Sequence, residues 1–329
     1  MRMSTTPLFD EREPFDRAGL ARTLRRLAEQ NIWIGTSSWK YDGWIGQVYT
    51  RERYLARGSF SKRLFEAGCL REYAETFPIV CGDFSFYQFP SELYWRRLFS
   101  SAPASLRYAF KVPEQITVKM FPSHPRYGRQ GGLLNPSYLD PGLFQEALLR
   151  PLAPYGEQIA VLILEFGTFP KKTYSQAREF VEDLDRFLSQ VPREFRYSVE
   201  IRNPEYLAAE YFQCLRSHGV AHVFNAWTRA PELGVQLRVP EAFTADFSVC
   251  RALLSRGRSY EDAVNLFSPY QEIKDPNPEG RRALRDLITH ARDNRRAAFI
   301  FVNNRFEGSA PLTIQGILEA SSRLINPKP

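Results

Sequence analysis

Eight short runs of apolar and β-branched residues recur along this chain, and they constrain its fold more than any other feature. Longer stretches with apolar residues at helical spacing separate them. Apolar strands that alternate with helices pair in parallel, and eight such strands close a barrel. The runs cover residues 32–36, 79–86, 107–111, 159–165, 197–201, 221–225, 247–253 and 298–303. The sequence therefore predicts an α/β fold, a TIM-like (β/α)8 barrel.

The stretches between the runs predict the helices. They cover residues 60–76, 174–190, 207–217, 281–295 and 311–323. Ser59 or Ser61 can cap the first helix, and Gly219 can end the third. A doubly wound open sheet is the alternative. No glycine-rich dinucleotide-binding turn follows the first run, which favours the barrel.

The chain has 329 residues, a length that barrels routinely use as a single domain. We expect the barrel over residues 31–325, and a partly helical N-terminal extension over residues 1–30. Two irregular segments, 120–141 and 228–240, leave the carboxyl ends of the third and sixth strands. Loops at that end of a barrel carry function, although surface insertion is the simpler interpretation.

Composition sets weaker limits on function. The net charge of +7 fits anionic ligands, but 44 basic and 37 acidic residues are largely interspersed. The four cysteines form no CxxC pair, so buried free thiols are expected. The first residues lack the apolar core of a secretory signal, and no run reaches about 18 apolar residues. A cytoplasmic protein without membrane attachment is the expectation.

Polar residues end each of the eight predicted strands. In a barrel these positions converge on one face, where ligands bind. Charges inside apolar runs are costly to bury unpaired. They therefore form either an internal ion-pair network or a site for a charged ligand. The residues at the strand ends are Thr36, Ser37, Asp83, Lys111, Glu165, Glu200, Arg202, Asn225, Arg251, Asn303 and Asn304.

We expect these residues to form a site for a small phosphorylated or carboxylated substrate. Glu200, with Glu165 or Asp83, would move a proton. Arg202 lies two residues after Glu200 on the same face of its strand, where it can orient the carboxylate or bind the anion. The predicted substrate contacts are Thr36, Ser37, Trp39, Trp44, Tyr87, Lys111, Arg202, Arg251, Asn303 and Asn304. Hydrolysis, lyase chemistry and isomerisation all fit.

No cofactor is expected, and a metal site is disfavoured. The four histidines, His124, His218, His222 and His290, do not gather at strand ends. Three strand-end carboxylates could still hold magnesium. No nucleophile elbow, phosphate-binding Walker loop or dinucleotide fingerprint is present.

Several motifs resemble the YecE-like family, catalogued as domain of unknown function seventy-two. They extend from about residue 32 to 318 and combine strand ends with the turns that follow them. The motifs are Gly35-Thr36-Ser37-Ser38-Trp39 with Tyr41 and Trp44, Ser85-Phe86-Tyr87, Phe110-Lys111-Val112-Pro113, Val199-Glu200-Ile201-Arg202-Asn203-Pro204 and Asn303-Asn304 with Gly308. The resemblance implies a TIM barrel without an established biochemical role.

The chain departs from the family pattern at several positions. Cys81 and Asp83 replace a Glu and an Asn, and Glu165 replaces a glutamine. Asn203 stands where the family has a histidine, and the segment after Arg251 lacks another. Both losses remove proton carriers, which indicates a divergent branch with a changed or lost activity.

Two other functions remain open. The basic stretch 281–296 and the arginines of 126–129 predict contacts to nucleic-acid phosphates. A non-catalytic scaffold is the other alternative. The sequence leaves the oligomeric state open.

Overall fold

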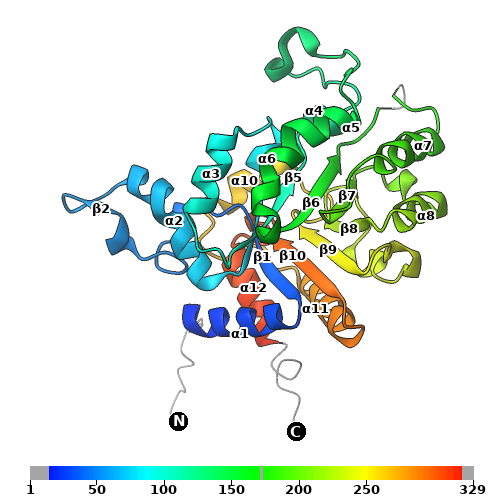
Figure 1. Ribbon diagram of the computed structural model, residues 1–329. Coiled ribbons are helices and arrows are strands. Elements are labelled where there is room, and N and C mark those ends of the chain that lie inside the picture. Colours follow the sequence, from blue (N-terminus) through cyan, green and yellow to red (C-terminus); the bar gives the residue numbers. More distant parts are fainter. Residues whose placement is uncertain (1–14, 171–172, 321–329) are drawn as a thin grey trace, which may run out of the picture.

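The computed structural model describes residues 15–170 and 173–320, and it is a closed barrel of eight parallel strands inside a ring of helices (Figure 1). Neighbouring strands follow the order β1-β10-β9-β8-β7-β6-β5-β4, and β4 pairs with β1 to close the barrel. The strands are β1 Ile32–Ser37, β4 Ile79–Gly82, β5 Arg107–Lys111, β6 Ile159–Phe166, β7 Tyr197–Ile201, β8 Ala221–Ala226, β9 Phe247–Ala252 and β10 Ala297–Val302. The predicted α/β barrel is confirmed.

The second barrel strand ends earlier than predicted. β4 stops at Gly82, because Asp83 has α-region backbone angles and Phe84–Phe86 form a short 3-10 turn. The hydroxyl of Ser85 donates to the carbonyl of Lys111 at 2.7 Å and ties this turn to β5. The turn brings Asp83 to the end of the barrel.

The barrel interior below the strand ends is apolar. Side chains from alternate positions of the strands fill it and form a core cluster separate from the one under the helices. Members of this inner cluster include Val161, Ile163, Val223, Val249 and Phe301. In the described part of the chain, the buried charged side chains on the barrel strands all lie towards the carboxyl ends: Lys111, Glu165, Glu200 and Arg251.

The helices cover the outside of the barrel. Their bounds are α1 Arg17–Glu29, α2 Lys62–Thr76, α3 Glu92–Ser100, α4 Glu114–Thr117, α5 Pro141–Phe144, α6 Arg150–Leu152, α7 Ala177–Leu188, α8 Ala209–Ser217, α9 Leu233–Gln236, α10 Tyr260–Phe267, α11 Pro278–Asp293 and α12 Ala310–Glu319. Each of the five predicted helices is present with shifted ends. For α2, Ser61 caps the helix by accepting from the amide of Leu64. Residues 321–323 of the last predicted helix lie outside the described residues.

Helix α1 packs against β1 and α2. Its Leu20, Leu24 and Leu27 are buried. Arg17 bonds to the carboxylate of Glu72 at 3.0 Å, and Glu72 itself is only 1% exposed. This helix is therefore held by both apolar packing and a charge pair. Residues 1–14 of the predicted extension lie outside the described part.

The two irregular segments differ in form. Residues 120–141 project beyond the barrel (top of Figure 1) and contain a 3-10 segment, Pro125–Gln130, with a bridge between Met120 and Leu134. Residues 228–240 contain the four-residue helix α9. A short antiparallel pair, β2 Leu55–Ala56 and β3 Ser59–Phe60, forms a third excursion after β1.

Candidate active site at the carboxyl end of the barrel

Six charged side chains from five strands meet at the carboxyl end of the barrel. We call them the mouth cluster: Asp83, Lys111, Glu165, Glu200, Arg202 and Arg251. Three are cations and three are carboxylates, so their formal charges balance. Five of them lie on or directly after strands β5, β6, β7 and β9, and Asp83 follows β4. The sequence predicted this convergence.

Arg251 lies at the centre of the cluster. Its Nη1 bonds to Glu165 Oε2 at 2.6 Å and also to Glu200 Oε2, while its Nη2 lies 3.2 Å from Asp83 Oδ1. Its side chain is only 2% exposed. One guanidinium therefore pairs with carboxylates from three strand ends, a geometry for which arginine is better suited than lysine.

Glu165 is held from the other side by two further cations. Lys111 Nζ lies 2.9 Å from Glu165 Oε2, and Arg202 Nη2 lies 2.8 Å from Glu165 Oε1. Burial alone would raise the pKa of Glu165, but Arg202, Lys111 and Arg251 together outweigh burial and hold that pKa well below its usual range. Glu165 is thus a fixed negative charge that organises the cations.

The members of the cluster differ in exposure. Glu200 is fully buried and Glu165 is 5% exposed, whereas Asp83 is 32% exposed and Arg202 17%. Asp83 is also the most loosely paired carboxylate, since Lys111 Nζ lies 3.9 Å from its Oδ1. Asp83 and Arg202 therefore form the outer surface of the cluster, and Glu200 supports them from below.

Aromatic rings flank Arg202 and Lys111. The guanidinium of Arg202 lies 3.8 Å from the ring centre of Trp227, and Lys111 Nζ lies 4.0 Å from that of Phe86. Such cation–π contacts fix the direction of a charged side chain without neutralising it. Trp227 was not among the predicted contacts, because it lies far from Arg202 in the sequence and no motif links the two residues.

Arg305, three residues after the end of β10, is a charged residue at the mouth that was not among the predicted site residues. It is half-buried, and its guanidinium lies 4.5 Å from the centre of the Tyr260 ring. No described carboxylate lies within ion-pair distance of it. Arg305 and Asp83 both influence the pKa of Tyr41, which burial raises to about 12. Arg305 therefore brings a positive charge without a carboxylate partner to this end of the barrel.

Four nitrogen donors near the mouth are buried and have no hydrogen-bond partner among residues 15–170 and 173–320. All come from segments on or after three adjacent strands, β1, β10 and β9. Buried donors without acceptors are rare in proteins, and each costs about 1–3 kcal/mol. The four atoms are Trp39 Nε1, Arg251 Nε, Asn304 Nδ2 and Arg305 Nε. Asn225 Oδ1, on β8 and in register with Arg251, is a buried acceptor without a partner at the same end. Unpaired nitrogen donors therefore outnumber it on this side of the mouth.

Several predicted contacts are occupied with the scaffold. Thr36 bonds to Tyr73 and to the carbonyl of Ser38. Asn304 Oδ1 accepts from Trp44 Nε1 at 3.2 Å and from the amide of Ala310 at 2.8 Å. These groups brace the strand ends, and we leave them out of the proposed ligand contacts.

The remaining predicted contacts take different positions. Asn303 caps the turn after β10 by accepting from the amide of Arg305 at 3.0 Å. Ser37 is buried with an unpaired hydroxyl, and Trp39 packs edge-on against Phe84. Tyr87 is 59% exposed and contacts Arg126, a residue of the projecting segment. None of these four side chains is hydrogen-bonded or ion-paired to the six charged residues of the mouth cluster.

A pocket of about 300 Å³ opens beside the mouth. It lies between the segments after β8 and β9 and the first turn of α11, and the six charged residues of the cluster do not line it. Trp227, whose ring contacts Arg202 of the cluster, lines this pocket. Phe306, the neighbour of Arg305, also forms part of its wall. The basic lining residues are Arg238, Arg256 and Arg282.

His222, on β8, has the character of a core residue. It packs between Tyr211, Phe212 and Phe224, and burial lowers its pKa to about 3. Its Nδ1 lies 3.2 Å from the hydroxyl of Tyr211. It is therefore neutral and takes no part in the mouth.

Across the described ranges, no helix is both long and apolar enough to cross a membrane.

Comparisons with known proteins agree with this architecture. The barrel resembles the DUF72 family protein of Thermotoga maritima, with 17% identity, a TM-score of 0.54 and coverage of 88% of this chain and 99% of that one. A DUF72 family protein of Enterococcus faecalis is similar, with 15% identity, a TM-score of 0.56 and coverage of 88% of this chain and 95% of that one.

At such identities these likenesses show the fold alone. A search of the curated proteins gave no match. The model of the family "Protein of unknown function DUF72" matches residues 33–327, nearly the whole barrel. The YecE-like family is that same family, so the resemblance in the sequence motifs is confirmed. The chain belongs to the DUF72 family of proteins of unknown function.

Proposed function

We propose that the protein is an enzyme that binds the anionic group of a small substrate at the mouth of the barrel. The surplus of nitrogen donors there carries this proposal. Arg305 has no carboxylate partner in the described chain, and its Nε and that of Arg251 are both buried without an acceptor. A phosphate or carboxylate supplies several acceptor oxygens together with the compensating charge.

The cost of burying six charges supports a functional origin for the cluster. Buried ion-pair networks are often no more stable than apolar residues of the same volume. The rest of the barrel interior is apolar, so a hydrophobic layer would fit here as well. The charges stand at the one end of the barrel where enzymes of this fold carry their sites.

Within this proposal Asp83 is the residue that moves a proton. Glu165 is held ionised by three cations, and Glu200 is fully buried, which leaves Asp83 as the carboxylate that a substrate can reach. An oxygen or carbon acid on the substrate would lose its proton to Asp83. Glu200 and Glu165, which the sequence predicted as proton carriers together with Asp83, become positioning groups.

The pocket beside the mouth supports a substrate larger than its anionic group. Its volume of about 300 Å³ lies at the lower end of the range for small-molecule sites. The ring of Trp227 stands between this pocket and Arg202. We place the anionic group against Arg305 and the remainder of the substrate along Trp227.

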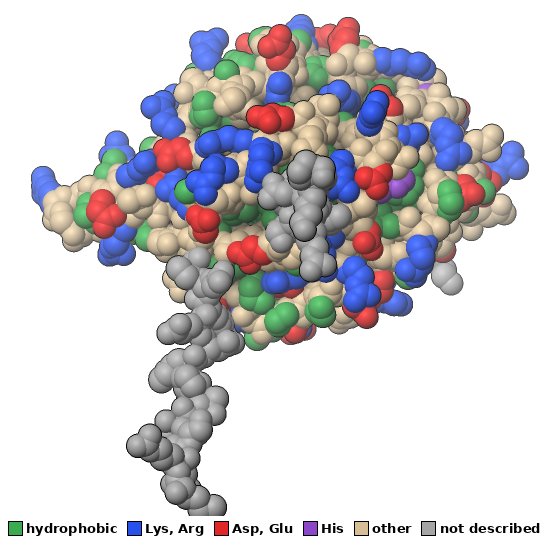
Figure 2. All heavy atoms as spheres, turned by 90° about the horizontal axis from the view of Figure 1, so that it is seen from below, with side chains coloured by type: hydrophobic (Ala, Val, Ile, Leu, Met, Phe, Trp, Pro, Cys, Tyr) green, Lys and Arg blue, Asp and Glu red, His purple; other side chains and the backbone are tan. Residues whose placement is uncertain are grey.

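Nucleic-acid binding has less support. Arg281 on α11 is ion-paired at 2.8 Å to Glu307, which is fully buried, and Arg126 pairs with Glu114. In the view from below, basic side chains are interspersed with acidic ones instead of forming a continuous track (Figure 2). Recognition of a phosphate backbone requires several unpaired cations along one path.

Anion binding is tested by thermal unfolding and calorimetry with inorganic phosphate, sulfate and citrate. The proposal expects at least one of these to raise the unfolding temperature, and expects Arg305→Gln to remove the effect. Arg193→Gln, an exposed arginine in the loop before β7 at the other end of the barrel, is the matched control and should retain it. No response in the parent protein, or equal responses in both variants, overturns the site.

Catalysis is tested separately with a panel of small phosphorylated and carboxylated compounds. A compound that binds and is turned over should still bind to Asp83→Asn with similar affinity, while its turnover falls by about 100-fold or more, the range of general-base catalysis. Binding that Arg305→Gln abolishes, but without turnover of any compound, would indicate the non-catalytic alternative.

A further inference from the structure

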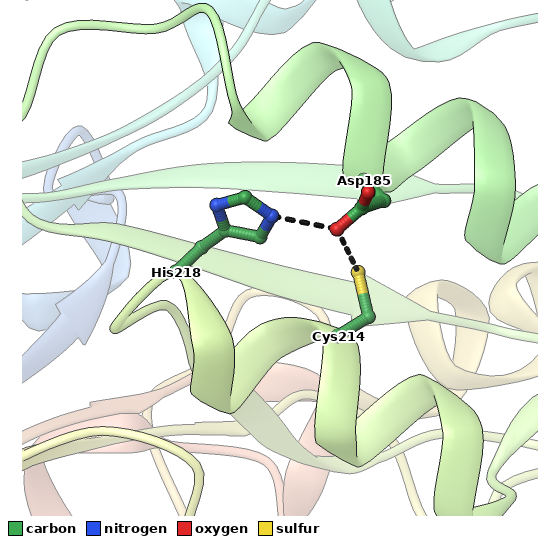
Figure 3. A group of neighbouring side chains, drawn as sticks. All are labelled: Asp185, Cys214 and His218. Carbon is green, nitrogen blue, oxygen red and sulfur yellow. Dashed lines mark hydrogen bonds and ion pairs between the residues drawn. The ribbon is translucent and has the colours of Figure 1, made fainter.

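Three side chains with different metal-binding atoms meet between two outer helices. Asp185 comes from α7, and Cys214 and His218 come from α8 and the residue that ends it (Figure 3). All three point into the space between the helices (Figure 3). The group lies outside the barrel and shares no residue with the mouth cluster.

The three atoms are close enough to share one ion. Asp185 Oδ1 lies 2.8 Å from His218 Nε2 and 3.9 Å from Cys214 Sγ. The ligand atoms of all three residues lie within 4.8 Å of one another. Zinc bonds of about 2.0–2.3 Å place tetrahedral ligands about 3–4 Å apart. Small side-chain rotations therefore complete the geometry.

The local backbone keeps two of these ligands together. Cys214 and His218 are four residues apart, a spacing that places both on the same face of a helix. Cys214 is 7% exposed and the side chain of His218 12%, so packing restricts both. Asp185 is 58% exposed, which leaves its carboxylate free to turn towards an ion.

The helix ends favour a positive ion at this place. Asp185 lies in the last turn of α7, and Cys214 and His218 lie in the last turn and at the C-cap of α8. The carboxyl end of a helix carries a partial negative charge from its free carbonyl groups. Two such ends meet here beside a carboxylate.

We propose that Asp185, Cys214 and His218 bind a zinc ion, with water in the fourth position. Thiolate, imidazole and carboxylate together match the ligand preference of zinc. On binding, the S–H bond of Cys214 breaks, its proton passes to the solvent and an S–Zn bond forms. The Nε2 lone pair of His218 bonds to the metal once its hydrogen has moved to Nδ1.

This ion would tie α7 to α8. In a barrel each helix runs back from the carboxyl end of one strand towards the amino end of the next, so the carboxyl ends of α7 and α8 lie away from the mouth. The zinc site is thus separate from the mouth, and it stands or falls independently of the proposed enzymatic function.

Cobalt(II) gives the clearest test, because it occupies zinc sites and has a spectrum. The full chain, freed of metal with a chelator, is titrated with cobalt alone. We expect a thiolate-to-cobalt charge-transfer band in the near ultraviolet and intense visible bands typical of tetrahedral geometry. One equivalent of zinc should abolish both and raise the unfolding temperature.

The variants are Cys214→Ser and Asp185→Asn, each checked for native folding by circular dichroism. Cys214→Ser should lose the charge-transfer band, and Asp185→Asn should weaken zinc binding, because a neutral amide replaces an anionic oxygen ligand. His290→Ala, a histidine on α11, is the matched control and should leave both readouts unchanged. Absence of the band in the parent chain, or its survival in Cys214→Ser, overturns the proposal.

Discussion

Glu165 and Glu200 are register partners on β6 and β7, and their carboxylates share one guanidinium nitrogen of Arg251. Two carboxylates so close together would repel each other if the arginine were absent. Arg251 thus determines whether the mouth of the barrel can contain these charges.

Loss of Arg251 should therefore be severe. Arg251→Met leaves buried carboxylates without their shared cation, and we expect the free energy of unfolding to fall by about 3–5 kcal/mol. Urea denaturation monitored by fluorescence measures it. Arg256→Met, in an exposed position, should change stability by less than about 0.5 kcal/mol. If Arg251→Met is as stable as the control, the pairing is not maintained in solution.

Acid should lower the free energy of unfolding, because Glu165 becomes protonated. Its pKa is lower in the folded chain than the value of about 4.3 expected when unfolded. It therefore stabilises the fold above that pH, and this contribution is lost as the pH falls below about 5. Denaturation between pH 7 and pH 3 should give a flatter stability profile for Glu165→Gln than for the parent chain. Parallel profiles would show that the cations do not act on Glu165.

His222 should make stability depend on pH in a second, higher range. Burial lowers its folded pKa to about 3, whereas the unfolded chain takes up the proton near pH 6.5. Its contribution is complete above about pH 6.5 and decreases by up to about 1.4 kcal/mol per unit below it. His222→Gln should remove this slope between pH 6.5 and 5, and His124→Ala, an exposed histidine, should keep it. Equal slopes in the two variants would contradict the burial.

Deletion of residues 1–30 should destabilise the barrel. It removes the apolar face of α1, with Leu20, Leu24 and Leu27, and takes Arg17 away from the buried carboxylate of Glu72. We expect a lower urea midpoint and a larger Stokes radius. An unchanged midpoint would mean that these residues are a dispensable extension.

The sequence predicted the barrel because its strands carry a local signal. Runs such as 159–165 are apolar throughout, and only burial on both faces explains this pattern. The predicted end of β4 was wrong, because Phe84 and Phe86 alternate with polar residues as in a strand but form a turn that leaves the sheet. Helix ends moved towards capping residues such as Ser61.

The mouth cluster was accessible from the sequence, because strand ends of a barrel must converge. The sequence could not show whether its charges pair with one another, because pairing depends on distances across five strands. Arg305 follows two predicted contacts directly, yet its lack of a carboxylate partner is a property of three dimensions. Asp185, Cys214 and His218 likewise come together only through the packing of α7 against α8.

The central claim is that the mouth of the barrel holds an anion. Diffraction from crystals soaked in selenate, whose selenium scatters anomalously, locates such an ion directly. The account predicts an anomalous peak within hydrogen-bond distance of the Arg305 guanidinium, and its loss in Arg305→Gln crystals. Peaks only at exposed arginines such as Arg256 and Arg282, with none at the mouth, would contradict it.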